Sequence, residues 1–582
     1  MNGSGVYLLI LLLLPLAGAI VVAAMAGAPV RTVKLTAMGF AVVEFVVALL
    51  LWFDYRNFLT EGGGSSPFDA TVHVDWIPSF GISFSLGIDG ISLVMIALIA
   101  FLVPIVLGAS WEEKLPAGRT IGGYFALLLT LQCAMVGVFA ATDVFLFYCF
   151  FELMLVPMYF LVGYFGGPRR AYAATKFFLY SLLGGLLMLA SVIGLYVASG
   201  KVLPAGTLDW AALRQIASQI PETTQLWIFA GFAVAFAIKA PLVPLHTWLP
   251  EAGSEAPVGA STLLVTVLDK VGTFGFLRVC LPLLPAASAK LTWLFLLLAL
   301  LGILYGAAVA AMQTDLKRFV TFTSIAHFGF IAMGVFAFTT QAMTGAVLYM
   351  LNHGIATGLL FIVVGMLIAR GGSRHVADYG GVWKVAPLLG GVFMVATMAT
   401  VALPGTNSFV SEFLVLIGMF DRSIAWGVLA TTGMILAAVY MLWIFQRTMT
   451  GPVRGAAVLP DGGDTAGDGP APAGQPSGAG PAVAEVGPSA DSGPSGAGAA
   501  ATVTSAATAV IDSGPDAHGP TKVKARFGDL NKREIAVVTP LIVAIIFLGI
   551  YPKPVLDVIH PTVVATMSAA GATDPGANGG GQ

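Results

Sequence analysis

Runs of about 20 apolar residues recur along this chain, and each is long enough to cross a lipid bilayer as a helix. Asp, Glu, Lys and Arg make up only 10% of the 582 residues, whereas soluble domains hold about 25%. Because lipid offers no hydrogen-bond partners, a crossing segment must satisfy its own backbone polar groups. The sequence therefore predicts an all-α polytopic membrane protein. Its formal net charge of -2 gives no support for a nucleic-acid partner.

The apolar runs predict about fourteen transmembrane spans. They cover residues 6–27, 33–53, 86–108, 121–140, 143–165, 174–198, 225–248, 257–280, 289–312, 318–338, 342–369, 387–420, 424–447 and 534–553. Two spans carry helix-breaking sequences, because Pro241 and Pro244 follow a lysine in the seventh and LPGTNSF (403–409) interrupts the twelfth. Broken helices in corresponding positions of two halves indicate inverted repeats, as in transporters.

The loops between these spans differ in charge. Nineteen Lys and Arg residues fall on one set of alternate loops and six on the other. Cytoplasmic loops carry the excess of Lys and Arg in membrane proteins. We therefore predict that both termini lie on the non-cytoplasmic side of the membrane.

Residues 451–531 differ in composition from the rest, being dominated by Gly, Ala, Pro, Ser and Asp. Such a segment cannot bury enough apolar surface to offset the entropy lost on ordering. We predict a disordered cytoplasmic linker between the thirteenth span and the last span at 534–553. The C-terminal residues 568–582 have a similar composition and are predicted to be a disordered tail.

Ionisable residues lie deep inside the predicted spans, and six of them are candidates for a shared function. A charge at the bilayer centre costs at least about 2.5–3.5 kcal/mol on insertion scales, so acids and bases kept there usually have a function. Burial and mutual contact can bring Glu, Lys and His close to neutral titration. We therefore predict a proton relay across the membrane. Its candidate residues are Glu152, Lys239, Lys270, His327, His353 and Glu412.

Each acid and base also has a structural interpretation. Glu152 can be a protonated carboxyl in a packed core, or it can pair with Lys239 as a switch or as a purely structural ion pair. Lys270 lies in mid-span, which suits a central relay position. Asp269 precedes it and points about 100° away on a regular helix. It need not pair with Lys270 directly, and it either tunes that lysine or faces a polar seam.

The remaining candidates also allow two interpretations. His327 and His353 lie on neighbouring spans and form either a relay or satisfied core histidines, and no third ligand is evident for a metal ion. Glu412 follows the break in the twelfth span. It is either an exchange site or a carboxylate favoured by the start of a helix. Three cysteines form no metal-binding spacing and are predicted to be packed apolar residues: Cys133, Cys149 and Cys280.

Several segments resemble the antiporter-like membrane subunits of bacterial respiratory complex I, the NADH:quinone oxidoreductase. They are FFELMLVPMYF, KAPLVPLHTWLPEA, TDLKRFVTFTSIAHFGFIAMG, MLNHGIATGLLFIVVGML and ALPGTNSFVSEFLVLIG. The resemblance covers roughly residues 80–450 and the last span. It implies a fourteen-helix fold with a three-helix N-terminal segment at 1–120. It further implies inverted five-helix repeats at spans four to eight (121–280) and nine to thirteen (289–447).

The resemblance also implies a proton channel in the bacterial cell membrane, driven by quinone reduction elsewhere in the complex. The expected partners are neighbouring antiporter-like subunits and the lipid bilayer. NADH, FMN, iron–sulfur clusters and quinone are expected in other subunits, and no cofactor in this chain. Residue by residue, the relay positions of the family match Glu152, Lys239, Lys270, His327, His353 and Glu412.

The chain departs from the family pattern in three places. Gly253 stands where a histidine commonly follows the TWLP motif, and Asp269 replaces an apolar residue beside the central lysine. The third departure is the long insertion at 451–531. Two other functions remain open, a subunit of an Mrp-type cation/proton antiporter and a membrane scaffold with no conducting path.

Overall fold

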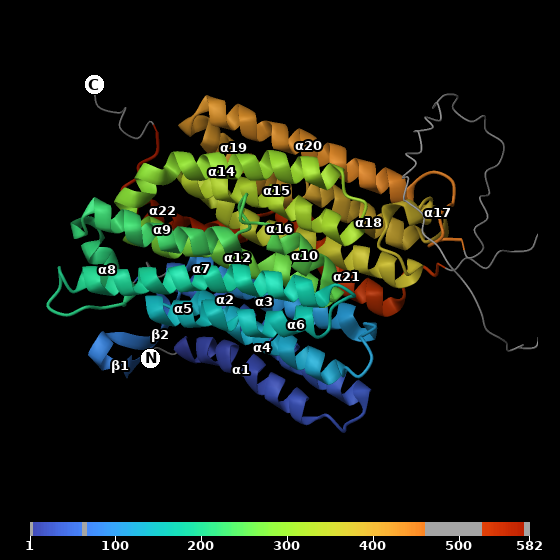
Figure 1. Ribbon diagram of the computed structural model, residues 1–582, viewed down its shortest axis with the longest axis horizontal. Coiled ribbons are helices and arrows are strands. Elements are labelled where there is room, and N and C mark those ends of the chain that lie inside the picture. Colours follow the sequence, from blue (N-terminus) through green and yellow to red (C-terminus); the bar gives the residue numbers. More distant parts are fainter. Residues whose placement is uncertain (1–3, 61–66, 460–526, 576–582) are drawn as a thin grey trace, which may run out of the picture.

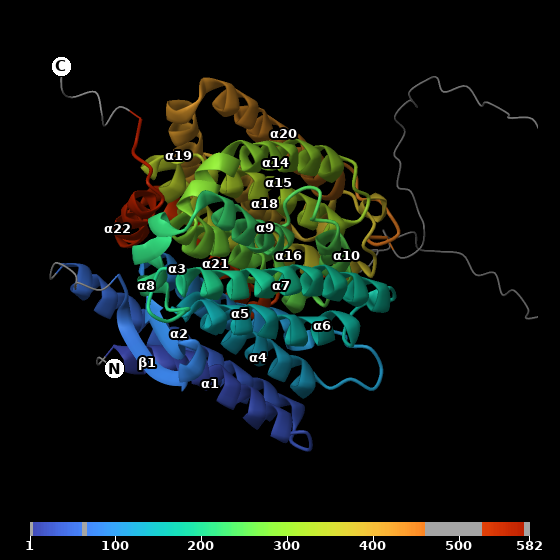
Figure 2. The same cartoon turned by 60° about the vertical axis from the view of Figure 1, so that its left-hand side comes forward.

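The computed structural model describes residues 4–60, 67–459 and 527–575. Most of these residues are helical, and the helices lie side by side along one common direction (Figure 1). The two edges of the bundle are formed by α1 (Gly5–Ala24) and α20 (Ile424–Met449) (Figures 1 and 2). Many large apolar side chains remain exposed on the outside of the bundle, as is required of a surface that faces lipid or other subunits.

Eleven helical segments within the described residues are long and apolar enough to cross a membrane. Besides α1 and α20 they are α2 (Val30–Thr60), α3 (Gly90–Ala109) with its 3-10 extension to Glu112, α4 (Ile121–Ala140), α5 (Val144–Leu153) with α6 (Leu155–Gly163), α7 (Arg170–Ser199), α14 (Pro285–Ala311), α15 (Leu316–Phe336), α16 (Thr340–Gly371) and α21 (Lys532–Ile550). Nearly all residues of α15 and α16 are buried, so these two helices form the centre of the bundle.

Three expected spans are interrupted in the structure. The seventh ends as α9 (Glu222–Lys239) and restarts as α10 (Trp248–Glu255), and the twelfth is divided into α18 (Pro387–Thr400) and α19 (Asn407–Arg422). The eighth alternates between α-helical and π-helical turns. Its parts are α11 (Val258–Leu263), a π turn (Leu264–Leu268), α12 (Lys270–Gly275), a second π turn (Phe276–Cys280) and α13 (Leu281–Leu283). The count of fourteen spans therefore stays a prediction.

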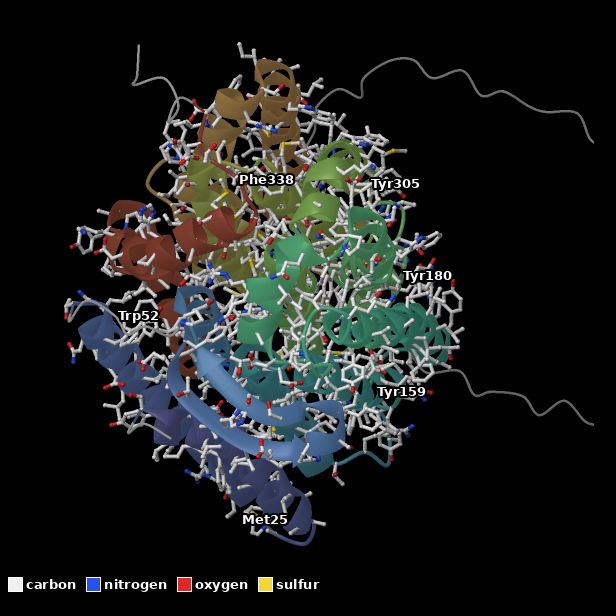
Figure 3. The ribbon with its side chains drawn as sticks, turned by 90° about the vertical axis from the view of Figure 1, so that its left-hand side faces the viewer. Met25, Trp52, Tyr159, Tyr180, Tyr305 and Phe338 are labelled. Carbon is white, nitrogen blue, oxygen red and sulfur yellow. The ribbon has the colours of Figure 1, made fainter. Side chains whose placement is uncertain are left out.

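One end of the bundle carries elements that the expectation of an all-α chain missed. The strands β1 (Asp69–Ile77) and β2 (Ile82–Ile88) form an antiparallel hairpin, which lies across this end in Figure 3. The short helices α8 (Trp210–Ile216) and α22 (Lys553–Ala569) lie at the same end (Figure 1). A short amphipathic helix is expected at 207–220, where α8 lies, whereas the hairpin and α22 fall between or after the apolar runs and were not predicted. The segment ISFSLGI of β2 alternates apolar and polar residues, which is typical of a strand.

The beginning of α1 and the end of α22 both lie at the hairpin end (Figure 1). The short helix α17 (Val382–Val385) lies at the opposite end. This placement agrees with termini on one side of the membrane, and it leaves open which side that is.

The predicted linker and tail lie only partly within the described residues, because 460–526 and 576–582 fall outside them. The predicted linker extends too far at its C-terminal end. Asp529 accepts hydrogen bonds from the backbone N–H groups of Leu388 and Leu389, at 2.9 and 3.0 Å, and so caps the start of α18. An aspartate at such a position satisfies N–H groups that the helix leaves free. The predicted tail begins inside α22, which ends at Ala569.

Candidate functional site

Lys239 is the last residue of α9, and its position follows from the prolines after it. Pro241 and Pro244 lack N–H groups and cannot continue the helix. The side chain of Lys239 is buried, with 1% of the residue exposed. Its Nζ lies 5.1 Å from the ring centre of Phe151 and 5.6 Å from that of Phe177. Among the described residues it has no hydrogen-bond partner, so this ammonium is balanced only by aromatic faces and more distant charge.

Glu152 lies in the last turn of α5, beside Phe151, and is only partly buried within this chain. Its carboxylate occupies space left by Gly185 of α7, because a Cβ at that glycine would lie 2.1 Å from Oε1. Within the described part of the chain Oε1 has no hydrogen-bond partner. The predicted partners Glu152 and Lys239, which we call the first pair, therefore lie on neighbouring helices without a direct hydrogen bond.

Lys270 is fully buried, and its Nζ contacts three acceptors. These are the Val265 carbonyl at 2.6 Å, Asp269 Oδ1 at 3.0 Å and His353 Nδ1 at 2.8 Å. An ammonium has three N–H donors, so the three contacts match a protonated lysine. The ring of Phe328 lies beneath it, with the ring centre 5.0 Å from Nζ.

The π turn Leu264–Leu268 explains why Lys270 meets Asp269 although neighbours on a regular helix diverge. A π turn widens the helix and weakens its regular hydrogen-bond ladder, often at functional positions. The side chain of Lys270 folds back over this turn to the Val265 carbonyl and meets Asp269 on the way. The expectation that the two side chains need not pair is therefore corrected.

From Lys270 the contacts continue through α16, α15 and α19. The rings of His353 and His327 lie 5.6 Å apart between their centres. His327 Nδ1 makes a short contact with the Tyr349 hydroxyl, which donates a short hydrogen bond to Glu412. Between His327 Nδ1 and Glu412 Oε1 the distance is 3.5 Å. We call the set Lys270, Asp269, His353, His327, Tyr349 and Glu412 the central cluster.

Two tyrosines of this region were missed by the sequence analysis. Tyr349 lies four residues before His353 on α16, a spacing that places both side chains on one helix face. The hydroxyl of Tyr440 on α20 lies 3.3 Å from His327 Nε2. Both tyrosines are fully buried. The four-residue spacing from a candidate histidine was a signal that could have found Tyr349, whereas nothing in the sequence pointed to Tyr440.

The break in the twelfth span is fixed to α16 by two amides. Asn352 Nδ2 donates to the Asn407 carbonyl at 2.7 Å, and Asn407 Nδ2 donates to the Asn352 carbonyl at 3.0 Å. Asn407 begins α19 and Asn352 precedes His353. This reciprocal pair sets the start of α19 against the central cluster, and Glu412 follows within the next two turns.

No group of three or more His, Cys, Asp or Glu side chains in the described ranges could hold a metal ion. Two of the three cysteines are buried and the third is half-buried, with all three free. The site is thus a line of titratable side chains within the bundle.

Comparison with known proteins places this chain in a family. The family model described as NADH:quinone oxidoreductase/Mrp antiporter, TM, matches residues 141–437. The chain is 40% identical to NADH-quinone oxidoreductase subunit M of Mycobacterium tuberculosis over 98% of this chain and 95% of the relative. The chain belongs to this family. It is also 38% identical to subunit M of Rhodobacter capsulatus, over 76% of this chain and 86% of the relative.

Two solved structures share the fold. A chain of respiratory complex I from Thermus thermophilus matches with a TM-score of 0.75 and 27% identity, covering 97% of this chain and all of that chain. A chain of the Mrp complex from Dietzia sp. DQ12-45-1b matches with a TM-score of 0.74 and 20% identity, covering 98% of this chain and all of that chain. The relay candidates from Glu152 to Glu412 all lie within the matched family segment.

In this member of the NADH:quinone oxidoreductase/Mrp antiporter family, basic residues of α15 and of the loop after α16 hold the segment that follows the break in the seventh span. Arg318 donates to Glu251 at 2.9 Å. Arg374 donates to the Ser254 carbonyl at 2.7 Å and to Glu255 at 3.2 Å. We call these contacts the α10 clamp. They tie the part of the chain that carries Lys239 to the part that carries the central cluster.

Gly253 lies within α10, where the family pattern commonly has histidine. A Cβ at this position would lie 2.5 Å from Cγ2 of Thr321 on α15. A distance below 3.0 Å forces something to shift, so α10 packs against α15 too closely for a larger side chain. The departure at Gly253 therefore goes with close packing between α10 and α15 in this chain.

Proposed function

We propose that this chain is the proton-translocating M subunit of a proton-pumping NADH:quinone oxidoreductase. The observation that carries the proposal is the run of contacts from Lys270 to Glu412 through the bundle centre. A proton path needs donors and acceptors within hydrogen-bond reach of one another. The steps from Lys270 to His353 and from His327 through Tyr349 to Glu412 meet this requirement. The rings of His353 and His327 lie 5.6 Å apart, so the step between them needs a ring movement or a bridging water.

The proposed roles follow the positions. Glu152 and Lys239 deliver protons to the path. Glu152 Oε1 and Lys239 Nζ have no hydrogen-bond partners among the described residues, so each side chain is free to change partner. Lys270 holds the proton at the centre and passes it to His353. His327 carries it on, and Glu412 releases it from the second half of the chain. Tyr349 bridges the last two groups because its hydroxyl can donate and accept.

The proposal includes fourteen spans with inverted five-helix repeats at 121–280 and 289–447. It also places both termini on the non-cytoplasmic side of the bacterial cell membrane, in agreement with the charge difference between the loops. The partners are other membrane subunits of the complex, in particular neighbouring antiporter-like subunits. NADH, FMN, iron–sulfur clusters and quinone belong to other subunits.

An Mrp-type cation/proton antiporter subunit is the second candidate. Its support is the family model, whose description names both kinds of protein, and the fold. The Mrp chain is only 20% identical, whereas two M subunits are 38% and 40% identical. Sodium transport favours a site rich in carboxylates and carbonyl oxygens. The line of Lys and His side chains in this chain favours protons.

The test uses the assembled complex in membrane vesicles, with quinone reductase turnover and proton pumping recorded together. Lys239→Ala and Glu152→Gln are expected to leave assembly intact and to lower both activities by about tenfold or more, since a proton-transfer group contributes on that scale. Glu44→Gln serves as the control, because Glu44 is a fully buried carboxyl on α2, outside the proposed relay. Unchanged turnover and pumping in both relay variants would contradict the proposal.

A further inference from the structure

Asp269 is a buried acid that the relay described above does not use. None of its surface is exposed, and its Oδ1 lies 3.0 Å from Lys270 Nζ. Within the described residues its Oδ2 has no hydrogen-bond partner. A carboxylate that is only partly satisfied in a dry interior is costly, so a contribution to stability does not explain its presence.

The three contacts of Lys270 make Asp269 the only carboxylate among its hydrogen-bond acceptors. The Val265 carbonyl and His353 Nδ1 are neutral acceptors, so they cannot balance the charge of an ammonium. When Lys270 gives one proton to His353, its amine keeps two N–H donors for Val265 and Asp269. The side chain therefore stays in place before and after the transfer.

We propose that the Asp269 carboxylate is a positioning residue of the relay, which holds Lys270 in its proton-loaded form until the proton passes to His353. In that step one N–H bond of Lys270 breaks and an N–H bond forms at His353 Nδ1. The bonding electron pair remains on the lysine nitrogen. His353 then holds the proton as an imidazolium, whose second N–H is on Nε2, an atom without a hydrogen-bond partner in the described part of the chain. This inference rests on the proposed function.

The surroundings of Asp269 contain few other titratable groups. The neighbouring helices bring His353 from α16, His327 from α15, Lys239 from α9 and Cys133 from α4. Apart from Asp269, these groups include no carboxylate. An opposite charge within about 4–6 Å of an ionisable group shifts the pKa of that group by about 1–3 units. Removing the Asp269 charge should therefore let Lys270 lose its proton at lower pH.

The test compares three variants in the assembled complex, with turnover and pumping followed against pH. Asp269→Asn keeps the shape without the charge, Asp269→Leu removes the polar group, and Asp269→Glu keeps the charge. We expect the alkaline limb of the activity profile to move about one pH unit lower in the Asn and Leu variants. The Glu variant and the Glu44→Gln control should keep the profile of the unaltered chain.

Three results would overturn this inference. The first is an unchanged profile in the Asn and Leu variants, and the second is an equal loss at every pH with no movement of the limb. The third is failure of both variants to assemble, which would assign Asp269 a structural role. Lys270→Gln separates the two proposals. If the Lys270→Gln complex keeps turnover and pumping, the proposed function fails. If it is inactive while the Asp269 variants keep the pH profile of the unaltered chain, only the role of Asp269 is rejected.

Discussion

The first pair and the central cluster contain similar residue types and differ in how their polar atoms are bonded. In the first pair, Lys239 Nζ and Glu152 Oε1 have no hydrogen-bond partners among the described residues. In the central cluster, Lys270 Nζ makes three hydrogen bonds, and contacts continue from it to Glu412. We call the first pair the open region and the central cluster the closed region, although Asp269 Oδ2, His353 Nε2 and Glu412 Oε2 also lack hydrogen-bond partners within the described residues.

This difference suggests different tasks. An open pair can change partners at little cost, because no hydrogen bond within the chain has to break, and it therefore suits gating. The closed region can pass protons with small movements of heavy atoms, since its other donors and acceptors already lie within reach and only the rings of His353 and His327, 5.6 Å apart, must approach each other. The direct approach of α12 to α9 joins the two. A Cβ at Gly272 would lie 2.4 Å from the Phe236 carbonyl oxygen, one turn before Lys239.

Among the following three changes, the largest effect on activity is expected from removing the Tyr349 hydroxyl from the central cluster. Tyr349→Phe removes the hydroxyl between His327 and Glu412 and leaves the two groups 3.5 Å apart. We expect proton pumping and turnover to fall by about tenfold, as for the loss of one proton-transfer group. Both rates would be measured in vesicles with the assembled complex.

Tyr440→Phe is the matched control. It removes a hydroxyl that contacts the other nitrogen of His327, at 3.3 Å, and lies off the route to Glu412. Its effect should be smaller than that of Tyr349→Phe. Equal losses in the two variants would contradict a route that depends on the Tyr349 hydroxyl in particular.

A smaller effect is expected from crowding the open region. Gly185→Ala places a methyl group where the Glu152 carboxylate now lies and forces that side chain to move. Overpacking of this kind costs about 1–3 kcal/mol, and we expect turnover to fall by about threefold with assembly retained. Gly39→Ala on α2 is the control, since a Cβ there meets nothing within 4 Å. Full activity in Gly185→Ala would show that the position of Glu152 is not critical.

The smallest effect is expected at the α10 clamp that links the two regions. Glu251 and Arg318 are partly exposed, and such pairs contribute about 0.2–1 kcal/mol. Glu251→Gln and Arg318→Gln should each lower turnover by about twofold. The double variant should lose no more than either single one, because the pair acts as a unit. Multiplied losses would mean that the two residues act separately.

Much of this arrangement was accessible from the sequence. Long apolar runs predicted most spans, and the prolines after Lys239 and the LPGTNSF segment predicted the interruptions of the seventh and twelfth spans but not that of the eighth. The residue types that are costly in lipid pointed to the relay candidates. The hairpin and α22 were not predicted because they lie outside the long apolar runs that indicate spans.

The contacts within the site were less accessible. Asp269 and Lys270 pair because a π turn precedes them, and hydrophobic periodicity gives no signal for such a turn. Tyr440 approaches His327 from a helix more than 100 residues away in the sequence. The unsatisfied atoms of the first pair depend on the packing of α5, α7 and α9, which composition does not determine.

The most direct test of a single path through the central cluster is a double-variant comparison at its two ends. Lys270→Gln and Glu412→Gln are measured singly and together in the assembled complex, with pumping and quinone reductase turnover recorded in the same vesicles. If the two groups act in series, the double variant should be no less active than the more impaired single variant. Multiplied losses would contradict a single path, and so would full activity in either single variant.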